Sequence, residues 1–241
     1  NLKNDKKYLI DATPDINFQL KELIGNENFS EKLNGIFITH AHMGHYAGLL
    51  NLGKESYNSK NIPLDSMPKL HDFILNNGPW NQLVNLNNIN LVKIFADKEL
   101  ILDDNLSLTP VQVPHRDEYS ETVGFIIKGN LKKALYIPDI DKWNKWNISI
   151  VEMIKKVDFA FLDGTFYDSN EINNRDISEI PHPFIIESLD LFKTLSKAEK
   201  DKIYFIHLNH TNPVLNKNSK EYKSVISKGF NVAETGMEFI L

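Results

Sequence analysis

The sequence predicts a mixed α/β fold built from layers of sheet and helix, and three observations support this class. The chain has 241 residues and 41% of them are apolar, which is enough to bury the core of one domain over residues 1–241. Short apolar runs typical of buried strands alternate along the chain with segments of helical spacing. Several strands then follow one another in the middle of the chain, which argues against a purely parallel, doubly wound sheet.

Each element is predicted from its local pattern. The apolar run at residues 8–10 predicts a strand, and Ile16, Leu20 and Ile24 lie at helical spacing directly after it. By the same reasoning we expect strands at residues 7–12, 35–39, 89–95, 106–113, 122–128, 133–137, 158–162 and 202–206. We expect helices at residues 14–24, 46–52, 148–156, 184–195 and 219–228, with two more inside 68–85. The polar segment 165–183 is expected to be a long loop.

Composition and charge restrict the partners of the chain. The formal net charge is −5 and the sequence has no basic block, so we expect no nucleic-acid partner. No apolar run approaches the ~20 residues that span a bilayer, and no signal peptide or lipidation motif is recognisable. The absence of cysteine excludes disulfides and thiolate metal ligands within these residues.

The start of the chain leaves its compartment open. The first residue is Asn1 rather than methionine, and a predicted strand begins almost at once. We therefore expect residues to be missing at the front. The sequence does not decide between the cytoplasm and the periplasm, and it is compatible with an oligomer.

Three histidines directly after a predicted strand give the sharpest chemical signal. The strand at residues 35–39 is followed by His40, His42 and His45. Three imidazoles within six positions can converge on one point, and neutral imidazole is the commonest metal ligand. Three such ligands on zinc leave a position open for water. The plain alternative is a fortuitous cluster of surface histidines, which the agreement of strand, spacing and following helix disfavours.

Further candidate ligands lie at the ends of later strands. His115, Asp139 and His207 each follow an apolar strand by one or two residues. Taken singly, each is more commonly explained as a capping residue or a hydrogen-bonded core residue. Their repeated position just past a strand is what a site along one edge of a sheet requires.

The order of these motifs resembles the metallo-β-lactamase superfamily. The motifs are the H-x-H-x-x-H run, a histidine before Val123-Gly124-Phe125, then Tyr136-Ile137-Pro138-Asp139, and a final strand followed by histidine. A closer resemblance is to the pyrroloquinoline-quinone biosynthesis protein B group. It is carried by Pro114-His115-Arg116-Asp117, Asp163-Gly164-Thr165-Phe166 and His207-Leu208-Asn209-His210-Thr211-Asn212-Pro213. The resemblance extends from Leu9 to Pro213.

The resemblance implies a fold and a set of metal ligands. The fold is an αβ/βα four-layer sandwich of two mixed sheets, with the family's first strands absent from this chain. The metal is Zn²⁺, as one or two ions, with iron and manganese as alternatives. A first ion would be held by His40, His42 and His115, and Asp139 would bridge. A second ion would be held by His45 and His207.

One departure from the family pattern concerns the second ion. The superfamily usually has aspartate directly before the third histidine, where this chain has Gly44. The second site loses an anionic ligand, so we expect it to bind metal more weakly, to use another carboxylate or to stay empty. Asp117 is the nearest carboxylate in type, although the sequence does not place it.

Three more residues are candidates for roles around the metal. We expect Asp163 to orient a ligand imidazole by accepting its second N–H. His210 is expected to lie behind the ligands or to contact substrate, and a loop-capping role is equally compatible. His182 precedes the predicted helix 184–195 and is expected to act catalytically, with an ordinary residue before a helix as the alternative.

These residues predict hydrolysis by metal-activated water. The bond would be ester-like, as in a phosphodiester, a carboxylic ester or a lactone, and the net charge favours a small-molecule substrate. A rival prediction is iron-dependent oxidation or hydroxylation of the pyrroloquinoline-quinone biosynthesis type, because histidine and aspartate also suit Fe(II). A second rival is a non-catalytic carrier of metal or a small molecule.

Overall fold

A computed structural model describes residues 6–25, 32–171 and 180–241. The chain divides into two compact units. The N-terminal unit comprises Asn1–Lys98 and Asp117–Val123, and the C-terminal unit comprises Glu99–Arg116 and Gly124–Leu241. The expectation of a single domain over residues 1–241 stays a prediction.

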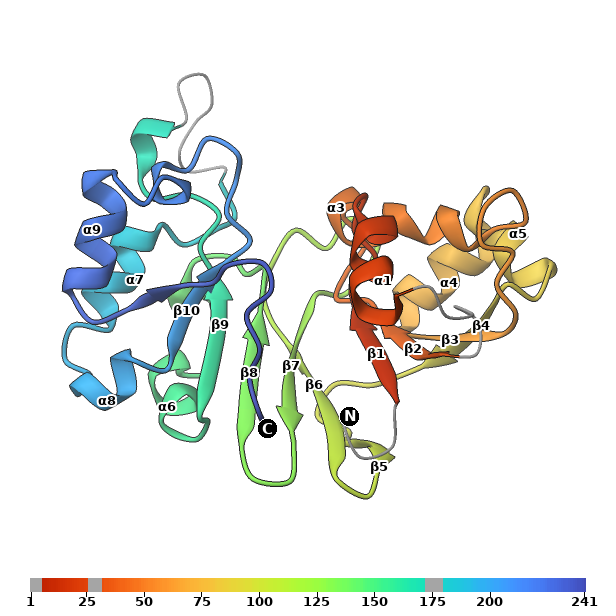
Figure 1. The fold of residues 1–241 in the computed structure, drawn as a ribbon, viewed down its shortest axis with the longest axis horizontal. Coiled ribbons are helices and arrows are strands. Elements are labelled where there is room, and N and C mark those ends of the chain that lie inside the picture. The colour runs from red at the N-terminus through yellow and green to blue at the C-terminus, as the bar shows by residue number, and fades with distance from the viewer. Residues whose placement is uncertain (1–5, 26–31, 172–179) are drawn as a thin grey trace. The chain divides into compact units, whose positions relative to one another are not determined.

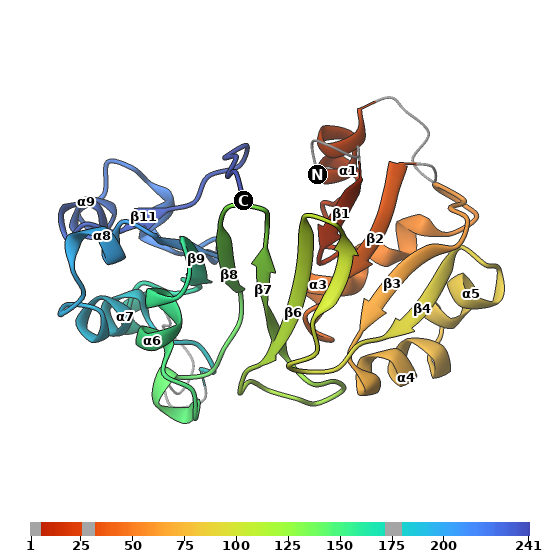
Figure 2. The same ribbon diagram turned by 90° about the horizontal axis from the view of Figure 1, so that it is seen from below.

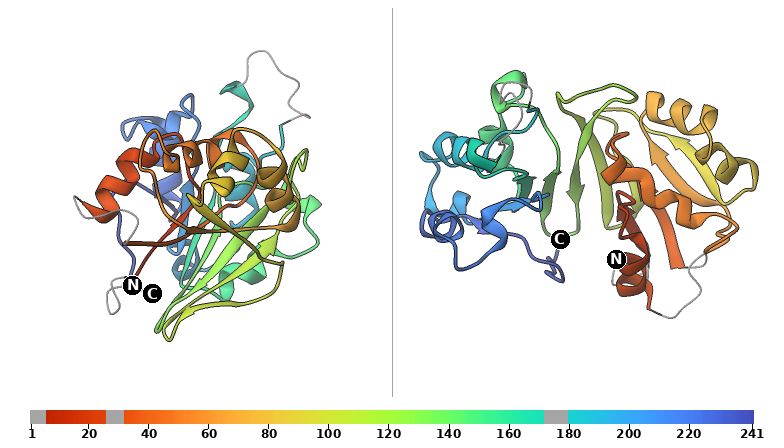
Figure 3. Two further views of the ribbon diagram at one scale, coloured as in Figure 1. Left: turned by 90° about the vertical axis from the view of Figure 1, so that its right-hand side faces the viewer. Right: turned by 90° about the horizontal axis from the view of Figure 1, so that it is seen from above.

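The described part of the N-terminal unit contains a four-stranded parallel sheet. Its order is β1-β2-β3-β4, with the strands β1 (Lys7–Ile10), β2 (Leu33–Phe37), β3 (Ile62–Ser66) and β4 (Ile89–Lys93). Parallel neighbours need crossover connections. When neighbours are also consecutive, right-handed crossovers place every connecting helix on the same face. Figures 1 and 3 show the helices of this unit gathered over one face of its sheet.

The helices of this unit bury its apolar core. They are α1 (Ile16–Ile24), α3 (Met43–Tyr46), α4 (Pro68–Asn76) and α5 (Trp80–Asn85), with the 3₁₀ helix η1 (Ala47–Leu52). Ile16 and Leu20 of α1, spaced by one helical turn, are buried with Ile36 of β2 and Leu64 of β3 in one cluster. This packing fixes the ends of β1 and β2, where the first candidate ligands lie.

The described part of the C-terminal unit contains a seven-stranded mixed sheet. Its order is β11-β10-β9-β8-β7-β6-β5, and Figure 2 shows β9, β8, β7 and β6 side by side. The strands are β5 (Leu100–Asp103), β6 (Leu106–Gln112), β7 (Val123–Lys128), β8 (Lys133–Ile137), β9 (Phe159–Asp163), β10 (Ile203–Ile206) and β11 (Asn231–Val232). β5 is antiparallel to β6, and β7 is antiparallel to β8. β8, β9, β10 and β11 run parallel to one another.

The parallel half of this sheet is connected through helices. These are α6 (Ile150–Lys155), α7 (Ile185–Leu191), α8 (Lys197–Lys200) and α9 (Lys220–Ser227). Ile154, Leu189 and Val225, one from each of three helices, are buried in a cluster with Leu162 of β9 and Phe205 of β10. Because β8, β9 and β10 are parallel, their carboxyl ends lie along one edge of the sheet. Asp139 and His207 follow β8 and β10, and Asp163 ends β9.

The structure confirms the mixed α/β class with two sheets and helices. It also contains elements that the sequence did not predict, namely β3, β5, β11 and α8. The short helix expected at residues 46–52 is present: Ala47–Leu52 form a 3₁₀ helix after the single α-turn of α3. Residues 172–179 of the predicted loop lie outside the described residues. In the described chain no helix is both long enough and apolar enough to cross a bilayer.

Candidate functional site

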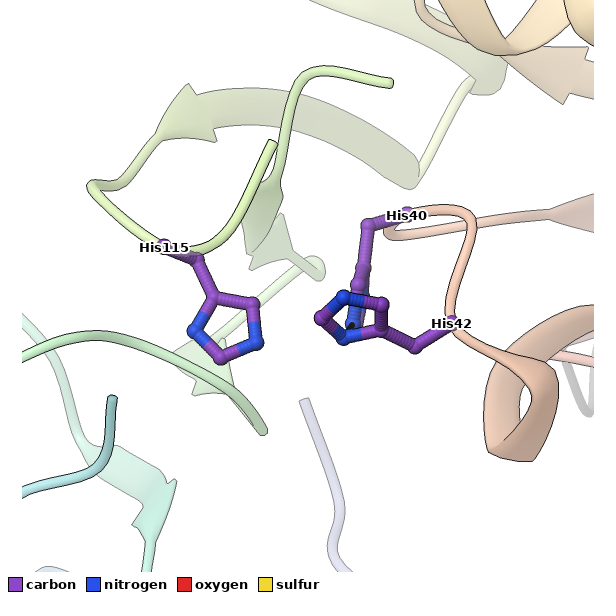
Figure 4. Close-up of side chains that lie close together, drawn as sticks. All are labelled: His40, His42 and His115. Carbon is purple, nitrogen blue, oxygen red and sulfur yellow. Dashed lines mark hydrogen bonds between the residues drawn. The ribbon is translucent and has the colours of Figure 1, made fainter. Parts of the chain in front are cut away.

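His40, His42 and His45 form a cluster at the exit of β2 in the N-terminal unit. His40 and His42 lie in the loop from β2 to α3, and His45 lies in α3. His40 and His45 are buried and His42 is partly exposed. Figure 4 shows the rings of His40 and His42 beside each other, and Nε2 of His40 lies 2.8 Å from Nδ1 of His42. Two nitrogens bound at about 2.0–2.1 Å to one tetrahedral zinc would lie about 3.3 Å apart, so little movement would bring this pair onto one ion.

A neighbouring oxygen holds one ring nitrogen of each imidazole. Thr39 Oγ1 lies 3.0 Å from Nδ1 of His40, and Asp11 Oδ2 lies 2.7 Å from Nδ1 of His45. Glu118 Oε2 lies 3.0 Å from Nε2 of His42. An oxygen on one ring nitrogen orients the ring and makes the opposite nitrogen the candidate metal ligand. The candidate ligand atoms are therefore Nε2 of His40, Nδ1 of His42 and Nε2 of His45.

Gly48 keeps His45 beside the end of β1. The Ala12 N–H donates to the His45 carbonyl at 2.7 Å, and the Gly48 N–H donates to the Ala12 carbonyl at 2.9 Å. A Cβ atom at Gly48 would lie 2.1 Å from the Thr13 carbonyl oxygen, a distance that no side chain tolerates. Glycine thus allows the close backbone approach that places His45 next to Asp11.

His115, Asp139 and His207 follow β6, β8 and β10 in the C-terminal unit, as the sequence predicts. His115 comes from the loop after β6 (Figure 4). Asp139 is 2% exposed. Its Oδ1 lies 3.9 Å from Nε2 of His115 and its Oδ2 lies 3.3 Å from Nε2 of His207. The two oxygens of Asp139 therefore face different imidazoles.

Asp163 and Thr165 support these groups from behind. Asp163 is fully buried, and its Oδ1 accepts a hydrogen bond from Thr165 Oγ1 at 2.7 Å. Thr165 Oγ1 in turn lies 2.9 Å from Nδ1 of His207. The other oxygen of Asp163, Oδ2, lies 2.8 Å from Nδ1 of His182. Asp163 thus contacts His182 directly and reaches the predicted ligand His207 through a threonine.

His182 lies against the same carboxylates. Its Nδ1 is 3.3 Å from Asp139 Oδ1, and His115, Asp139 and His182 each offer a ligand atom within 4.8 Å of the others. Burial lowers the pKa of His182, but the charge and hydrogen bond of Asp163 and the charge of Asp139 outweigh it. The pKa is raised above its ordinary value, with the positive charge of Arg116 opposing.

The helix after His182 offers no anion site. The sequence predicts that helix at residues 184–195, whereas α7 has seven residues, Ile185–Leu191. Its first N–H groups are already bonded, from Ile185 to the Phe166 carbonyl and from Ile186 to the Tyr167 carbonyl. Unpaired N–H groups at the start of a helix can bind an anionic substrate. The N–H groups of Ile185 and Ile186 are bonded to backbone carbonyls, so they do not support such a site.

His210 and Asp117 are both exposed. His210 lies in an exposed turn three residues beyond His207. Asp117 is an exposed residue of the N-terminal unit and accepts a hydrogen bond from Thr122 at 2.9 Å. The carboxylate that contacts His45 is Asp11 and not Asp117. Roles for His210 and Asp117 at the site remain predictions.

Asp11 and Thr165 contact candidate ligands but are not among the site residues predicted from the sequence. Asp11 directly follows the apolar run Tyr8-Leu9-Ile10, so the rule that selected the polar residues after later strands also selects it. Thr165 follows β9 by two residues, but a hydroxyl in a loop is too common to be a signal by itself. The threonine becomes informative only when its contacts with Asp163 and His207 are known.

The chain belongs to the beta-lactamase superfamily. The family model described as "Beta-lactamase superfamily domain" matches residues 6–208, which confirms the resemblance inferred from the motifs. The superfamily includes metal-dependent hydrolases, and the matched range contains every predicted metal ligand.

Curated relatives of the chain are named "Coenzyme PQQ synthesis protein B". One from Gluconobacter oxydans (strain 621H) is 31% identical over 126 residues, which cover 50% of this chain and 40% of that protein. Another, from Pseudomonas fluorescens (strain Pf0-1), is 24% identical over 266 aligned positions, covering 97% of this chain and 83% of that protein. The first match thus spans less than half of its relative's length.

Solved structures share the fold over nearly the whole chain. Zn(2+)-bound PqqB from Methylobacterium extorquens is similar with a TM-score of 0.79 and 21% identity, covering 99% of this chain and 85% of that one. A diphosphatase from the PhnP family is similar with a TM-score of 0.66 and 21% identity, covering 97% of this chain and 79% of that one. At these identities the likeness establishes the fold and leaves the reaction open.

Proposed function

We propose that this protein is a metal-dependent hydrolase that acts on an ester-like bond of a small molecule, a phosphodiester, a carboxylic ester or a lactone. The observation that carries the proposal is the convergence of His40 Nε2 and His42 Nδ1 to 2.8 Å, with the opposite nitrogen of each ring held by an oxygen. Membership of the superfamily supports it. The proposed metal ligands are His40, His42, His45, His115, Asp139 and His207.

The donor types of the proposed ligands fit zinc. Zinc takes imidazole nitrogen and carboxylate oxygen ligands in fourfold coordination, and the proposed ligands are five imidazoles and the carboxylate of Asp139. Outer oxygens orient the rings, as is usual for histidine ligands. The zinc in the similar PqqB structure agrees with this choice, and iron or manganese is the alternative.

The chemistry divides between the metal and the side chains. A divalent ion held by imidazoles lowers the pKa of coordinated water toward about 7 and supplies hydroxide at neutral pH. Asp139 would supply a carboxylate ligand to the metal. We propose His182 as the general acid, because Asp163 holds its Nδ1 and leaves Nε2 as the nitrogen that can pass a proton to a leaving oxygen.

Hydrolysis is tested with protein loaded with a single metal. The metal-free chain, reconstituted with zinc, manganese or iron(II), is assayed on bis(p-nitrophenyl) phosphate, p-nitrophenyl esters and a set of lactones. We expect metal-dependent turnover of at least one class, abolished in His40→Ala. If wild type and His40→Ala show the same residual rate on every substrate, the observed activity does not belong to this site.

Iron-dependent oxidation is the second candidate, and an observation in the C-terminal unit favours it. Two imidazoles, His115 and His207, face one carboxylate, Asp139, and two histidines with one carboxylate are the ligands of many non-haem Fe(II) oxygenases. The curated relatives are named for synthesis of coenzyme PQQ. Oxygen consumption by the iron-loaded protein with a candidate quinone precursor, without turnover of the ester panel, would select this function.

A non-catalytic carrier of metal or of a small molecule is the third candidate. Tight binding of metal together with the absence of both hydrolysis and oxygen consumption would select it. Isothermal titration with the compounds of the ester panel distinguishes a carrier from an inactive preparation, because a carrier retains measurable affinity for its ligand.

A further inference from the structure

A cavity of about 490 Å³ lies among the helices of the C-terminal unit. Its lining comes from α7, α8 and α9 and from the turns that follow α7 and α9, and Figures 1 and 2 show these three helices near one another. The volume falls within the range of about 300–1,000 Å³ that is usual for small-molecule sites. None of the proposed metal ligands lines this cavity, so it is no part of the proposed metal site.

The floor of the cavity is apolar and fixed by the core. It is formed by Leu189 of α7 and by Phe230, which are 4% and 2% exposed. The Phe230 ring packs against the rings of Phe192 and Phe205, with centroids 6.4 and 6.2 Å away. Ile186 adds an apolar side chain to the lining and is 41% exposed. A ligand with an apolar body would therefore remove apolar surface from water in this cavity.

Gly229 brings a cation and an aromatic ring to the cavity together. It follows the end of α9 and has a left-handed backbone, with φ of 89°. Glycine adopts this conformation without steric cost and for that reason commonly ends helices. The chain reverses at Gly229, so that both Lys228 before it and Phe230 after it line the cavity.

Three lysines and one carboxylate give the cavity a positive charge. The ammonium of Lys193 donates to Asp190 at 2.9 Å, so these two charges offset each other. The ammonium of Lys200 donates to the carbonyl of Lys193 at 2.8 Å and lies 5.9 Å from the centre of the Phe230 ring. Within the described residues, the ammonium of Lys228 has no hydrogen bond or ion pair. Two ammonium groups in the lining are thus left without a carboxylate.

Helix electrostatics explains part of this arrangement. Lys200 is the last residue of α8 and Lys228 directly follows α9, and lysine is favoured at a helix C-terminus by the partial negative charge there. That partial charge is about half a unit, so the full charge of each lysine exceeds it. The helix ends do not explain the apolar floor between the lysines. A ligand with both an apolar body and a negative group accounts for the floor and for the lysines.

We propose that this cavity binds a small organic anion, whose apolar body covers Leu189 and Phe230 and whose negative group lies at Lys200 and Lys228. Each methylene placed on the floor should raise the affinity about fourfold. A hydrogen bond from an ammonium to the anion should add about tenfold or more. The site does not depend on the proposed hydrolysis, because neither the metal nor its ligands take part.

Titration of ¹⁵N-labelled protein with fatty acids tests the proposal by NMR. A chelator keeps the protein free of metal, which excludes binding of a carboxylate to zinc. We expect affinity to rise about fourfold per added CH₂ from butanoate through hexanoate to octanoate, with the largest amide shifts in residues 186–193 and 228–230. Octanamide has the same chain without the charge and should bind about tenfold more weakly. Equal affinity for octanoate and octanamide, or no binding of octanoate at millimolar concentration, would overturn the proposal.

Lys228→Ala tests the contribution of charge. We expect it to lower octanoate affinity by about tenfold and to remove most of the preference for octanoate over octanamide. Lys223→Ala is the matched control, since Lys223 is an exposed lysine of the same helix outside the cavity lining. An equal loss in both variants would mean that octanoate is attracted by the overall surface charge, and the proposal would then be wrong.

Ile186→Ala tests the apolar contact. We expect it to weaken octanoate and octanamide alike, by on the order of fivefold, because the contact does not involve charge. Ile226→Ala is the matched control: Ile226 is 43% exposed on α9, close to the 41% of Ile186, and lies outside the cavity lining. If Ile186→Ala binds octanoate no more weakly than Ile226→Ala does, the ligand does not occupy this cavity and the proposal is overturned.

Discussion

Asp11 and His45 meet at the exit of β1, where Asp11 Oδ2 lies 2.7 Å from Nδ1 of His45 and both side chains are buried. Asp11 has a left-handed backbone with φ of 64°, a conformation that aspartate and asparagine adopt more readily than most residues. The same carboxylate accepts the Thr39 N–H at 2.8 Å. One aspartate therefore ties the end of β1 to the histidine cluster after β2.

We predict that Asp11→Asn lowers zinc affinity by about 10–100-fold while the protein remains folded. Asparagine tolerates the backbone conformation and can still accept from Thr39, so the variant removes mainly the negative charge beside His45. The measurement is zinc titration with a chelator competitor, accompanied by circular dichroism. Asp15→Asn, an exposed aspartate of the same unit, is the control. Equal affinity in Asp11→Asn and wild type would show that the carboxylate does not support a ligand.

Gly44→Asp should strengthen binding of a second ion. A Cβ atom at Gly44 would meet no heavy atom within 4 Å, and the backbone there is not left-handed, so the substitution is accommodated. It restores the carboxylate that the superfamily usually has before the third histidine. We expect the weaker of two zinc affinities to rise by on the order of tenfold, a step of about 1.4 kcal/mol. If the wild type already binds two equivalents of zinc tightly, glycine at position 44 does not weaken the second site and this prediction is wrong.

His182→Ala should reduce turnover by about 10²–10⁴-fold, the usual contribution of a general acid, and leave zinc content unchanged. The reason is that Asp163 holds one side of the ring, so that the other nitrogen can serve a leaving group. Zinc content by mass spectrometry and turnover of the best substrate are measured on the same samples. His71→Ala, whose ring lies by Asp72, is the control. Loss of zinc from His182→Ala would make His182 a ligand.

Much of the fold can be predicted from the sequence, but some strands depend on tertiary contacts. The strand β3 contains Pro63 and Asp65, residue types that are depleted in strands. It forms because β2 and β4 bond to it on either side, and no local pattern contains that information. β5, with four residues, is stabilised by pairing with β6 in a hairpin.

The candidate site shows the same division. The H-x-H-x-x-H spacing is local, so the sequence predicts these histidines. The contact of Asp11 with His45 joins residues 34 positions apart, and that of Thr165 with His207 joins residues 42 positions apart. Their partners are determined by which strands become neighbours in the sheets. For this reason the groups that orient the ligands appear only in the folded structure.

Asp65 gives a pH-dependent prediction outside the site. Burial raises the pKa of its carboxyl from 3.8 to about 6, so the folded protein binds a proton that the unfolded chain releases. Unfolding free energy therefore falls as the pH rises from about 4 to 6. Asp65→Asn should stabilise the protein at pH 7 by about 1–2 kcal/mol, a value reduced because the carboxyl is partly exposed.

Chemical denaturation at pH 4 and pH 7 checks the effect of Asp65. The gain from Asp65→Asn should be present at pH 7 and largely absent at pH 4, whereas Asp97→Asn, at an exposed position of the same unit, should show no such difference. A gain that is equal at both pH values would mean that charge burial is not its cause.

The proposed function has His40, His42, His115 and Asp139 as ligands of a metal ion, and a zinc-loaded crystal measured on both sides of the zinc absorption edge tests it most directly. We predict an anomalous peak with the nitrogens of these histidines and an oxygen of Asp139 at about 2.0–2.2 Å. A peak coordinated by other residues, or His115 or Asp139 turned away from the ion with different ligands in their place, would contradict the account.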